Sequence, residues 1–523
     1  MDAEKPVRTL TPQGGWSQGD GMTSEQKPIF DAVILAARNN EPLCQMIEAR
    51  AGRGKTWLME LIVATARREG IIVLCVASTA LAATNYRGGR TSHSQLCIPA
   101  GDDPTPGHRV VCNLQLGSQH ATFLRAVRLI IWDEVYNSNR FDIEAVDRML
   151  RDLMNVNIPF GGKVMVFGGD RRQIPPVIPG AEPQEVARSV ISASRTIWPH
   201  CKVSELVHPV RDASDPLYSA FVDSLGDNTA AHVDLPCEIA EIFHSKESKL
   251  CAVPSFVSST TDVQDAINFV YPNMESLRDD PSDFKHHAII TTTNYEAELF
   301  NNAVVRAMGY ADDDETIHEL LSSDRMADDP NARNLSPEYM EGLARAPGTP
   351  PHRLRLFVGA MCMLMRNFDP KLGLINSRKC IVKQIWTGGV NANSRSTHKA
   401  VEIALIMPDP EIPGGWCEST ETYVIPRIKF NFKPPRTKNL HIMRMQFPLM
   451  MCYAITNNKA QGQTLARVAI DQRNDSFSHG QTYVAFGRVR DRGSVCVLVR
   501  PERKVEDVAY IRNIVYPPLL SRL

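Results

Sequence analysis

Residues suited to phosphate chemistry cluster in one short stretch near the start of the chain. The segment from Ala49 to Thr56 reads Ala-Arg-Ala-Gly-Arg-Gly-Lys-Thr, and it lies between an apolar run and a helical pattern. In such a segment the backbone N–H groups around Gly52 and Gly54 wrap a phosphate, Lys55 neutralises its charge, and the threonine hydroxyl binds Mg²⁺. The segment predicts a nucleotide site; a Gly-rich turn without such a role is the alternative.

Two further segments supply the remaining groups of such a site. The apolar run Leu129-Ile-Ile-Trp ends in the carboxylates Asp133 and Glu134. Asp133 is a candidate for holding Mg²⁺ through water, and Glu134 for orienting and deprotonating the attacking water. A third apolar run ends in Gly-Gly-Asp-Arg-Arg-Gln173, where the glutamine is placed to sense the γ-phosphate. Together the three segments predict a lobe that hydrolyses ATP.

The elements that must position these residues follow from the apolar pattern. Strand-like runs at 45–47, 71–76, 129–132 and 163–167 alternate with helical stretches. Buried strands separated by helices are typical of a parallel sheet in a doubly wound α/β lobe, which binds its ligands at the carboxyl ends of the strands. Two more runs, at 287–292 and 468–471, predict strands that belong together in a second lobe.

We therefore predict an α/β chain with two parallel-sheet lobes and a small β-rich insert in the second lobe. The expected parts are a flexible tail at 1–22, a first lobe at 23–200, a second lobe at 201–352 and 446–523, and the insert at 353–445. An acidic, Pro-rich stretch at about 309–350 is expected to be a surface connection within the second lobe.

Composition indicates where in the cell the protein is expected more clearly than it indicates an activity. The chain of 523 residues has a net charge of −1, which leaves room for a basic track balanced by an acidic remainder. Its 12 cysteines include no CxxC pair, which favours reduced thiols and a nuclear or cytoplasmic location. The polar, acidic start is not typical of a signal peptide, and no apolar stretch is long enough for a membrane span.

Read in order, the segments resemble the Pif/RecD-type DNA helicases of superfamily one, most closely the Helitron-like branch. The matching stretches are 26–31, 77–83, 88–94, 160–179, 210–216, 364–376, 456–465 and 477–489. The resemblance implies RecA-like lobes, a β-barrel-like insert, ATP and Mg²⁺ as cofactors, and single-stranded and forked DNA as partners. It also implies 5′→3′ movement.

The resemblance further implies roles for individual residues. Gln26 would read the adenine, and Arg211 and Arg488 would reach the γ-phosphate from the facing lobe. DNA contacts would come from Thr79, His93, Lys459 and Gln461, although His93 has a packed loop histidine as its alternative. A basic and aromatic run at 427–444 predicts either a DNA track or a solvated edge strand.

The phosphate loop departs from the family pattern. Arg50, Ala51 and Arg53 stand where the family usually has Pro, Gly and Thr. Alanine is disfavoured by about 1 kcal/mol wherever the backbone needs a positive φ, so Ala51 raises the question of a slowed enzyme. The added arginines predict either assistance to phosphate binding or crowding. Gly487 replaces a usual serine, and Val135-Tyr136 a usual Ala-Pro.

Three functions fit these observations. The first is an ATP-dependent DNA helicase in replication, repair or recombination, and the second is a helicase of transposon origin. The third, from a different class, is a catalytically weakened relic that binds DNA without unwinding it. ATP turnover separates the third function from the other two.

Overall fold

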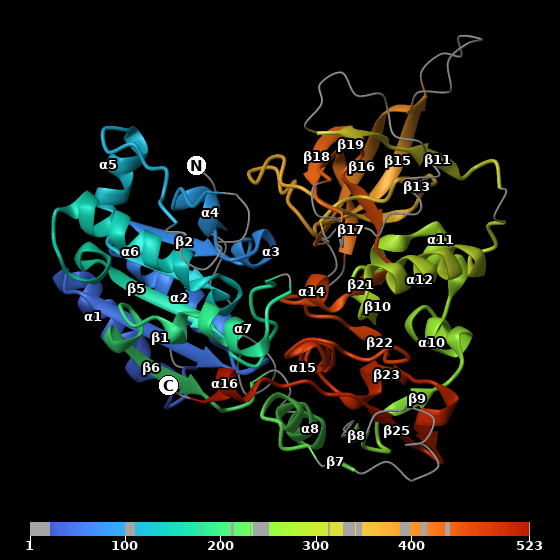
Figure 1. Cartoon of the computed structure of the whole chain (residues 1–523), viewed down its shortest axis with the longest axis horizontal. Helices are drawn as coiled ribbons and strands as arrows, with labels where there is room; N and C mark the ends of the chain where they lie inside the picture. The colour runs from blue at the N-terminus through green and yellow to red at the C-terminus, as the bar shows by residue number, and fades with distance from the viewer. Residues whose placement is uncertain are drawn as a thin grey trace.

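The computed structural model describes residues 21–99, 110–178, 180–210, 214–230, 232–233, 250–311, 314–327, 340, 348–387, 398–408, 416–434 and 440–521. They form two α/β lobes and a β-rich insert, which confirms the predicted fold class (Figure 1). Most of the predicted tail, residues 1–20, lies outside the described part. No helix among the described residues combines the length and apolar character needed to cross a membrane.

The first lobe is built on a parallel sheet with strand order β3-β2-β4-β5-β1-β6. Its strands are β1 (Leu43–Ala49), β2 (Val73–Ala77), β3 (Arg90–Thr91), β4 (Leu129–Asp133), β5 (Val164–Gly169) and β6 (Cys201–Leu206). Alternate residues of β4 face opposite sides of the sheet, as strand geometry requires. Leu129 and Ile131 pack with α1 (Gln26–Asn39) and α2 (Lys55–Arg68), whereas Ile130 and Trp132 pack with α5 (Gln119–Ala126) and α6 (Arg140–Met154).

The second lobe is built on another parallel sheet, with strand order β21-β10-β22-β23-β9. Its strands are β9 (Ser258–Thr260), β10 (His287–Thr291), β21 (Ala454–Thr456), β22 (Arg467–Asp471) and β23 (Val495–Leu498). β10 and β22 pair directly, which confirms that the two runs belong together. Its helices include α8 (Pro216–Gly226), α10 (Val263–Val270), α12 (Asn294–Ala307) and α15 (Gln481–Phe486).

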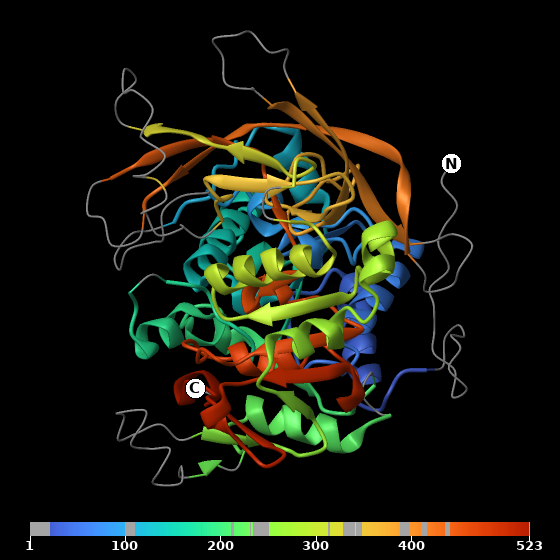
Figure 2. The same ribbon diagram turned by 90° about the vertical axis from the view of Figure 1, so that its right-hand side faces the viewer.

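The insert is antiparallel and lies above the second lobe in both views (Figures 1 and 2). One of its sheets has the order β17-β16-β15-β14-β20, another the order β12-β19-β18, and β11 pairs with β13. The strands are β11 (His318–Leu321), β12 (Ser323–Met326), β13 (Arg353–Leu356), β14 (Met361–Leu364), β15 (Lys379–Thr387), β16 (His398–Pro408), β17 (Trp416–Pro426), β18 (Ile428–Phe432), β19 (Ile442–Gln446) and β20 (Leu449–Met451).

Strand pairing places several segments differently from the prediction. β6 completes the sheet of the first lobe although residues from 201 onward were assigned to the second. The stretch at 309–350, predicted to be a surface connection, contributes β11 and β12 to the insert, where they pair with β13 and β19 and where Asp324 is buried against Arg444. β20 also joins the insert. The C-terminal helix α16 (Pro517–Leu520) returns to the first lobe, where Leu519 is part of the core.

Candidate functional site

The phosphate loop connects β1 to α2. At two of its glycines the backbone adopts a conformation that other residues rarely enter. Gly52 and Gly54 adopt φ values of 81° and 80°, a region that glycine enters without steric cost. Positive φ falls at these glycines and not at Ala51, so the alanine introduces no strain of the kind that the sequence suggested. A Cβ at Gly54 would lie 2.8 Å from Gln26 Nε2, the far end of that side chain. The predicted adenine-reading residue therefore lies directly against the loop.

Lys55 and the two carboxylates predicted to act with it form one buried group. Lys55 Nζ lies 2.6 Å from Asp133 Oδ1 and 3.2 Å from Glu134 Oε1. Burial opposes the lysine charge, but the two carboxylates outweigh it and raise the pKa of Lys55. Burial raises the pKa of Glu134 against the opposing effect of Lys55. Tyr86 donates to the second oxygen of Asp133 at 2.9 Å, a contact that the sequence did not suggest.

Glu134 has a backbone conformation that is uncommon for its residue type. Its φ of 53° and ψ of 42° lie in the left-handed region, which costs a non-glycine residue on the order of 1 kcal/mol. Ser78 Oγ donates to the Glu134 carbonyl at 2.7 Å and supports the turn. Residues in such conformations cluster at functional sites, where the surrounding structure over-determines them. The turn brings the Glu134 carboxylate to Lys55.

Oxygen donors for a magnesium ion are present at this position. Thr56 lies in the first turn of α2, and Asp133 ends β4. A hydroxyl and a carboxylate are the donors that Mg²⁺ takes together with phosphate oxygens and water, so the residues fit the ion. Within the described ranges, no three His, Cys, Asp or Glu side chains gather as a metal-binding group of their own.

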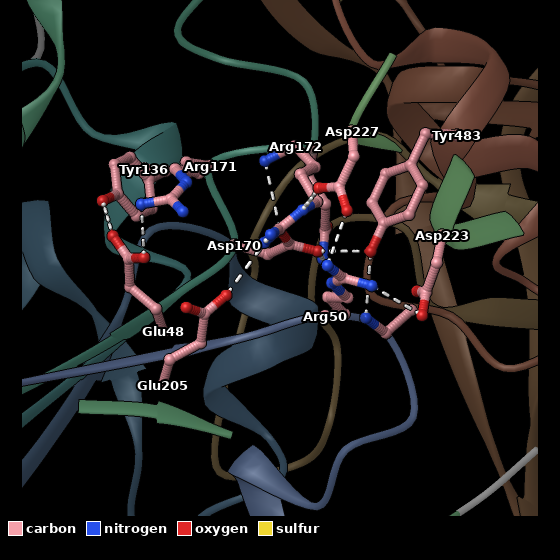
Figure 3. A network of polar contacts seen from close by, with 12 residues as sticks. Glu48, Arg50, Tyr136, Asp170, Arg171, Arg172, Glu205, Asp223, Asp227 and Tyr483 are labelled. Atoms are coloured by element: carbon pink, nitrogen blue, oxygen red, sulfur yellow. Dashed lines mark hydrogen bonds and ion pairs between the residues drawn. The ribbon is translucent and has the colours of Figure 1, made fainter. Parts of the chain in front are cut away.

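The segment after β5 ties the two lobes together through Asp170 (Figure 3). Tyr483 of α15 donates its hydroxyl to Asp170 Oδ2 at 2.8 Å and accepts the Ala51 backbone N–H at 3.1 Å. Burial, with the Asp170 carboxylate, raises the pKa of Tyr483 well above its usual value, so the hydroxyl keeps its proton. Gln173 Nε2 donates to the same Asp170 oxygen at 3.3 Å. Tyr483 of the second lobe thus contacts both the phosphate loop and the segment after β5 that leads to Gln173.

Tyr136, another departure from the family pattern, has a defined place in the same region (Figure 3). Its buried hydroxyl donates to Glu48 Oε1 at 2.5 Å, and the other Glu48 oxygen lies 2.8 Å from Arg171 Nη1. Glu48 belongs to β1, directly before the phosphate loop. Tyr136 therefore helps to fix the end of the strand that carries the loop.

His479 forms a further contact between the lobes. Its Nε2 lies 3.0 Å from the Arg171 carbonyl, and its Nδ1 lies 2.9 Å from the Tyr516 backbone nitrogen. A carbonyl can only accept and a backbone N–H can only donate, so these partners require a neutral ring protonated at Nε2. Burial lowers the pKa of His479 to about 4. At the next residue, Gly480, a Cβ would lie 2.4 Å from the Arg172 carbonyl, so the close approach requires glycine.

The second lobe presents Arg488 and Gln461 toward the nucleotide group. Arg488 is buried and donates to carbonyls of its own lobe, Val484 at 2.8 Å and Gln463 at 3.3 Å. Burial lowers the pKa of Arg488, and the Glu134 carboxylate acts in the opposite direction. Gln461 Nε2 donates to Gln173 Oε1 at 3.1 Å. The other predicted arginine, Arg211, lies outside the described residues.

A groove of about 1260 Å³ runs along the junction of the two lobes and the insert. Ile174 and Pro175, directly after Gln173, contribute to its wall. Exposed aromatic side chains, Tyr295 at 71% and Phe477 at 61%, line it with Lys459. A basic group beside exposed aromatic rings is typical of surfaces that grip a single nucleic-acid strand. Sequence reasoning missed both rings, since each is an isolated aromatic residue outside any basic run.

Of the four residues predicted to contact DNA, Thr79, His93 and Gln461 do not line the groove. Thr79 is exposed and its hydroxyl caps the short helix α3 (Ala80–Ala83). His93 is exposed on α4 (Ser92–Gln95), so it is not the packed loop histidine of the alternative. Gln461 contacts Asn137 and Gln173 of the first lobe, at 2.9 and 3.1 Å. Lys459 is the member of this group that lines the groove.

The described part of the basic run at 427–444 is turned inward at two of its arginines. Arg427 Nη1 donates to the Leu321 carbonyl at 2.6 Å, and Phe430 is fully buried. Arg444 is buried with Asp324, its Nε lying 2.7 Å from Oδ1, although it also contributes to the groove wall. Arg427 and Arg444 therefore stabilise the insert, whereas Lys429 and Lys433 are exposed on or beside β18, at the edge of its sheet, as the solvated alternative predicted.

The arrangement defines a class: two RecA-like lobes with a phosphate loop and an acidic pair at their junction. Residues 21–224 match the family model of the PIF1-like helicase, and residues 338–385 match that of the DNA helicase Pif1 2B domain. The chain is therefore similar to the PIF1-like helicases over these two ranges. The second match falls on the insert, which the sequence had predicted as a separate β-rich part.

Relatives and solved structures show the same similarity to Pif1 helicases. The chain is 24% identical to the ATP-dependent DNA helicase PIF7 of Trypanosoma brucei brucei, over 94% of this chain and 48% of that protein. It is 24% identical to the zebrafish (Danio rerio) ATP-dependent DNA helicase PIF1, over 93% of this chain and 62% of the relative. The chain thus spans about half to two thirds of these proteins. The crystal structure of Candida albicans Pif1 helicase covers 91% of this chain, at 23% identity and a TM-score of 0.57, over 94% of its own length.

Proposed function

We propose that the protein is an ATP-dependent DNA helicase that moves along single-stranded DNA and separates duplex strands. The observation that carries the proposal is the buried group of Lys55, Asp133 and Glu134 at the junction of two RecA-like lobes. A groove with exposed aromatic rings begins beside it, directly after Gln173. ATP turnover and strand movement can be coupled because one segment takes part in both sites.

Each residue of the nucleotide site has a role that its surroundings support. The loop N–H groups and Lys55 would bind the β- and γ-phosphates, with Gln26 beside the base. Glu134 would accept the proton of the attacking water, and its raised pKa makes it a stronger base than an exposed glutamate. Gln173 would sense the γ-phosphate. Arg488, with Arg211 as the second finger, would stabilise the charge on the transferring phosphoryl group.

Magnesium would be held by Thr56 and Asp133. When bound, the ion would neutralise charge on the phosphate oxygens, and Asp133 would offer it a carboxylate that Tyr86 already orients. Lys55 lies 2.6 Å from the same carboxylate, so its charge would act beside that of the ion.

The DNA strand would lie in the groove between the lobes and the insert. Tyr295 and Phe477 would stack on bases, and Lys459 would pair with a phosphate. A Bacteroides Pif1 of related fold was crystallised with single-stranded DNA and ADP-AlF3; it is 20% identical, with a TM-score of 0.59, over 91% of this chain and 92% of that one. Movement in the 5′→3′ direction and placement in the Helitron-like branch remain predictions from the sequence.

The cellular role stays at the level of the sequence prediction: replication, repair, recombination or a transposon-derived function, in the nucleus or cytoplasm. The alternative of a weakened relic gains no support from the comparisons with known helicases.

ATP hydrolysis with and without single-stranded DNA tests the proposal, with Glu134→Gln as the control. Since Gln keeps the shape of the side chain but cannot act as a base, the variant should bind nucleotide and lose about a hundredfold or more in turnover. Turnover that rises with DNA and disappears in the variant supports a motor. Turnover no higher than in the variant, with DNA binding intact, would point to the relic instead.

A further inference from the structure

The two arginines that distinguish this phosphate loop from the family pattern both bind carboxylates at the end of α8: Asp223 in its last turn and Asp227, its C-cap residue. Arg50 lies 2.7 Å from Asp223 Oδ2 through Nη1 and 2.5 Å from Asp227 Oδ2 through Nη2. Arg53 Nη2 lies 2.6 Å from the same Asp223 oxygen and also contacts Ser219 Oγ at 3.2 Å. Asp223 and Asp227 are four positions apart, so both face the loop from one side of the helix.

Helix α8 is part of the second lobe, so these ion pairs cross between lobes. Tyr218 donates its hydroxyl to the Phe486 carbonyl of α15 at 2.8 Å, and Phe221 packs edge-on against the Phe486 ring at 5.3 Å. At the other end of the helix, Arg492 Nε binds Asp215 Oδ2 at 2.8 Å. The helix is therefore fixed to the second lobe at its start and along its length, and presents its last turn to the first.

Asp227 also binds the segment that follows β5. Arg172 Nε lies 2.5 Å from Asp227 Oδ1, while its Nη2 lies 3.3 Å from Glu205 of β6 (Figure 3). Gly226 makes the approach possible, because a Cβ there would lie 2.9 Å from the Tyr483 ring and 3.0 Å from Arg172 Cδ. One turn of α8 thus binds the phosphate loop and the segment that leads to Gln173.

Burial makes the pairing strong enough to hold the loop. The Arg53 side chain is 3% exposed and that of Arg50 19%, and the two carboxylates are 21% and 28% exposed. Ion pairs at this depth are screened by salt less than exposed pairs are. A buried guanidinium that loses its carboxylate must rearrange, and Arg50 and Arg53 lie on either side of Gly52. The backbone N–H groups of the loop would then lose their fixed positions.

We propose that Asp223 and Asp227 are positioning residues of the nucleotide site, which hold the phosphate loop through Arg50 and Arg53 and fasten it to the second lobe. The inference rests on the proposed nucleotide site. It explains why arginines occur at two loop positions where the family usually has Pro and Thr: their charges are neutralised by carboxylates of the facing lobe. Nucleotide binding and the relative position of the lobes are coupled through this contact.

The test compares Asp223→Asn/Asp227→Asn with the full wild-type chain. We expect the Kd of fluorescently labelled ADP to rise about tenfold, since a buried ion-pair contact typically contributes at this scale. In ATP hydrolysis KM should rise more than kcat falls, because the aspartates do not touch the reacting atoms. Asp223→Glu/Asp227→Glu keeps the charges and should recover most of the affinity. The matched control is Glu69→Gln, which breaks the exposed Arg38–Glu69 pair at 2.5 Å within the first lobe.

A double-mutant comparison shows whether the aspartates act through the arginines. Adding Arg50→Gln to Asp223→Asn/Asp227→Asn should cost no further affinity, since both ion pairs of Arg50 are already broken. Unchanged or tighter ADP binding by Asp223→Asn/Asp227→Asn overturns the inference, as does a Glu variant no better than the Asn variant. Wild-type protein that binds no ADP at all would instead overturn the proposed function, so the two failures are distinguishable.

Discussion

Tyr483→Phe removes a single oxygen from the contact between the phosphate loop and the second lobe. The ring would keep its place beside Gly226, whereas the Ala51 N–H would lose its acceptor and Asp170 would lose a donor. A neutral hydrogen bond contributes about 1 kcal/mol and a bond to a carboxylate about 2 kcal/mol. Asp170 keeps Gln173 as a donor at 3.3 Å, so we expect a net loss of about 2 kcal/mol.

Amide hydrogen exchange measures this loss locally, without requiring the whole chain to unfold in one step. A change of about 2 kcal/mol corresponds to about 30-fold faster exchange of the Ala51 amide, read from a peptide spanning the loop. Tyr271→Phe is the control, since it removes a similar buried hydroxyl bond, 2.7 Å to the Tyr453 carbonyl, within the second lobe. Exchange in Tyr483→Phe within about threefold of wild type would refute the reasoning.

Three other predictions concern acidity, DNA and metal. His479 has a lowered pKa of about 4, so the stability it contributes is complete above its unfolded pKa of about 6.5 and is lost as pH falls toward 4, by about 3 kcal/mol. Urea midpoints should therefore fall with acid more steeply in wild type than in His479→Gln, and equal slopes would contradict the neutral ring. Tyr295→Ala and Phe477→Ala should each weaken oligo-dT binding on the order of tenfold by fluorescence anisotropy, whereas Trp386→Ala, an exposed aromatic outside the groove lining, should not. Unchanged affinity in the groove variants would place the strand elsewhere. Chelation by EDTA should abolish ATP turnover and added Mg²⁺ restore it; turnover that persists in EDTA would contradict the assigned ion.

Short contiguous patterns predicted much of the fold and the centre of the site. Four strands of the first lobe, β1, β2, β4 and β5, lie within a few residues of the apolar runs, because buried parallel strands are apolar on both faces. Lys55, Asp133 and Glu134 were found because each ends or follows such a run, and parallel strands bring those ends to one edge of the sheet. The pairing of β10 with β22 followed from the same kind of pattern.

Contacts between distant helices could not be predicted in this way. Asp223 and Asp227 look like the solvated face of a helix, and nothing near them in the sequence reveals Arg50 as their partner. Tyr483 reads as a core residue, although its hydroxyl binds Asp170. These interactions depend on how two lobes dock, which a local pattern does not contain.

The basic run at 427–444 shows the opposite difficulty, since a local pattern suggested more than the structure supports. Charge and aromatic content predicted a strand-binding track or a solvated edge, yet Arg427 and Arg444 bind groups inside the insert. An arginine can satisfy a buried carboxylate as readily as a phosphate, because its planar donors fit both. Only the position of Asp324 distinguishes the two roles for Arg444.

Strand separation on a forked duplex tests the central claim most directly. Purified wild-type protein, with ATP and Mg²⁺, would be given duplexes bearing a 5′ tail, a 3′ tail or both, beside Glu134→Gln. The account predicts ATP-dependent unwinding by wild type, with the 5′-tailed duplex preferred, and none by the variant. ATP turnover without strand separation on any of these substrates, or equal separation by Glu134→Gln, would contradict the assignment as a helicase motor.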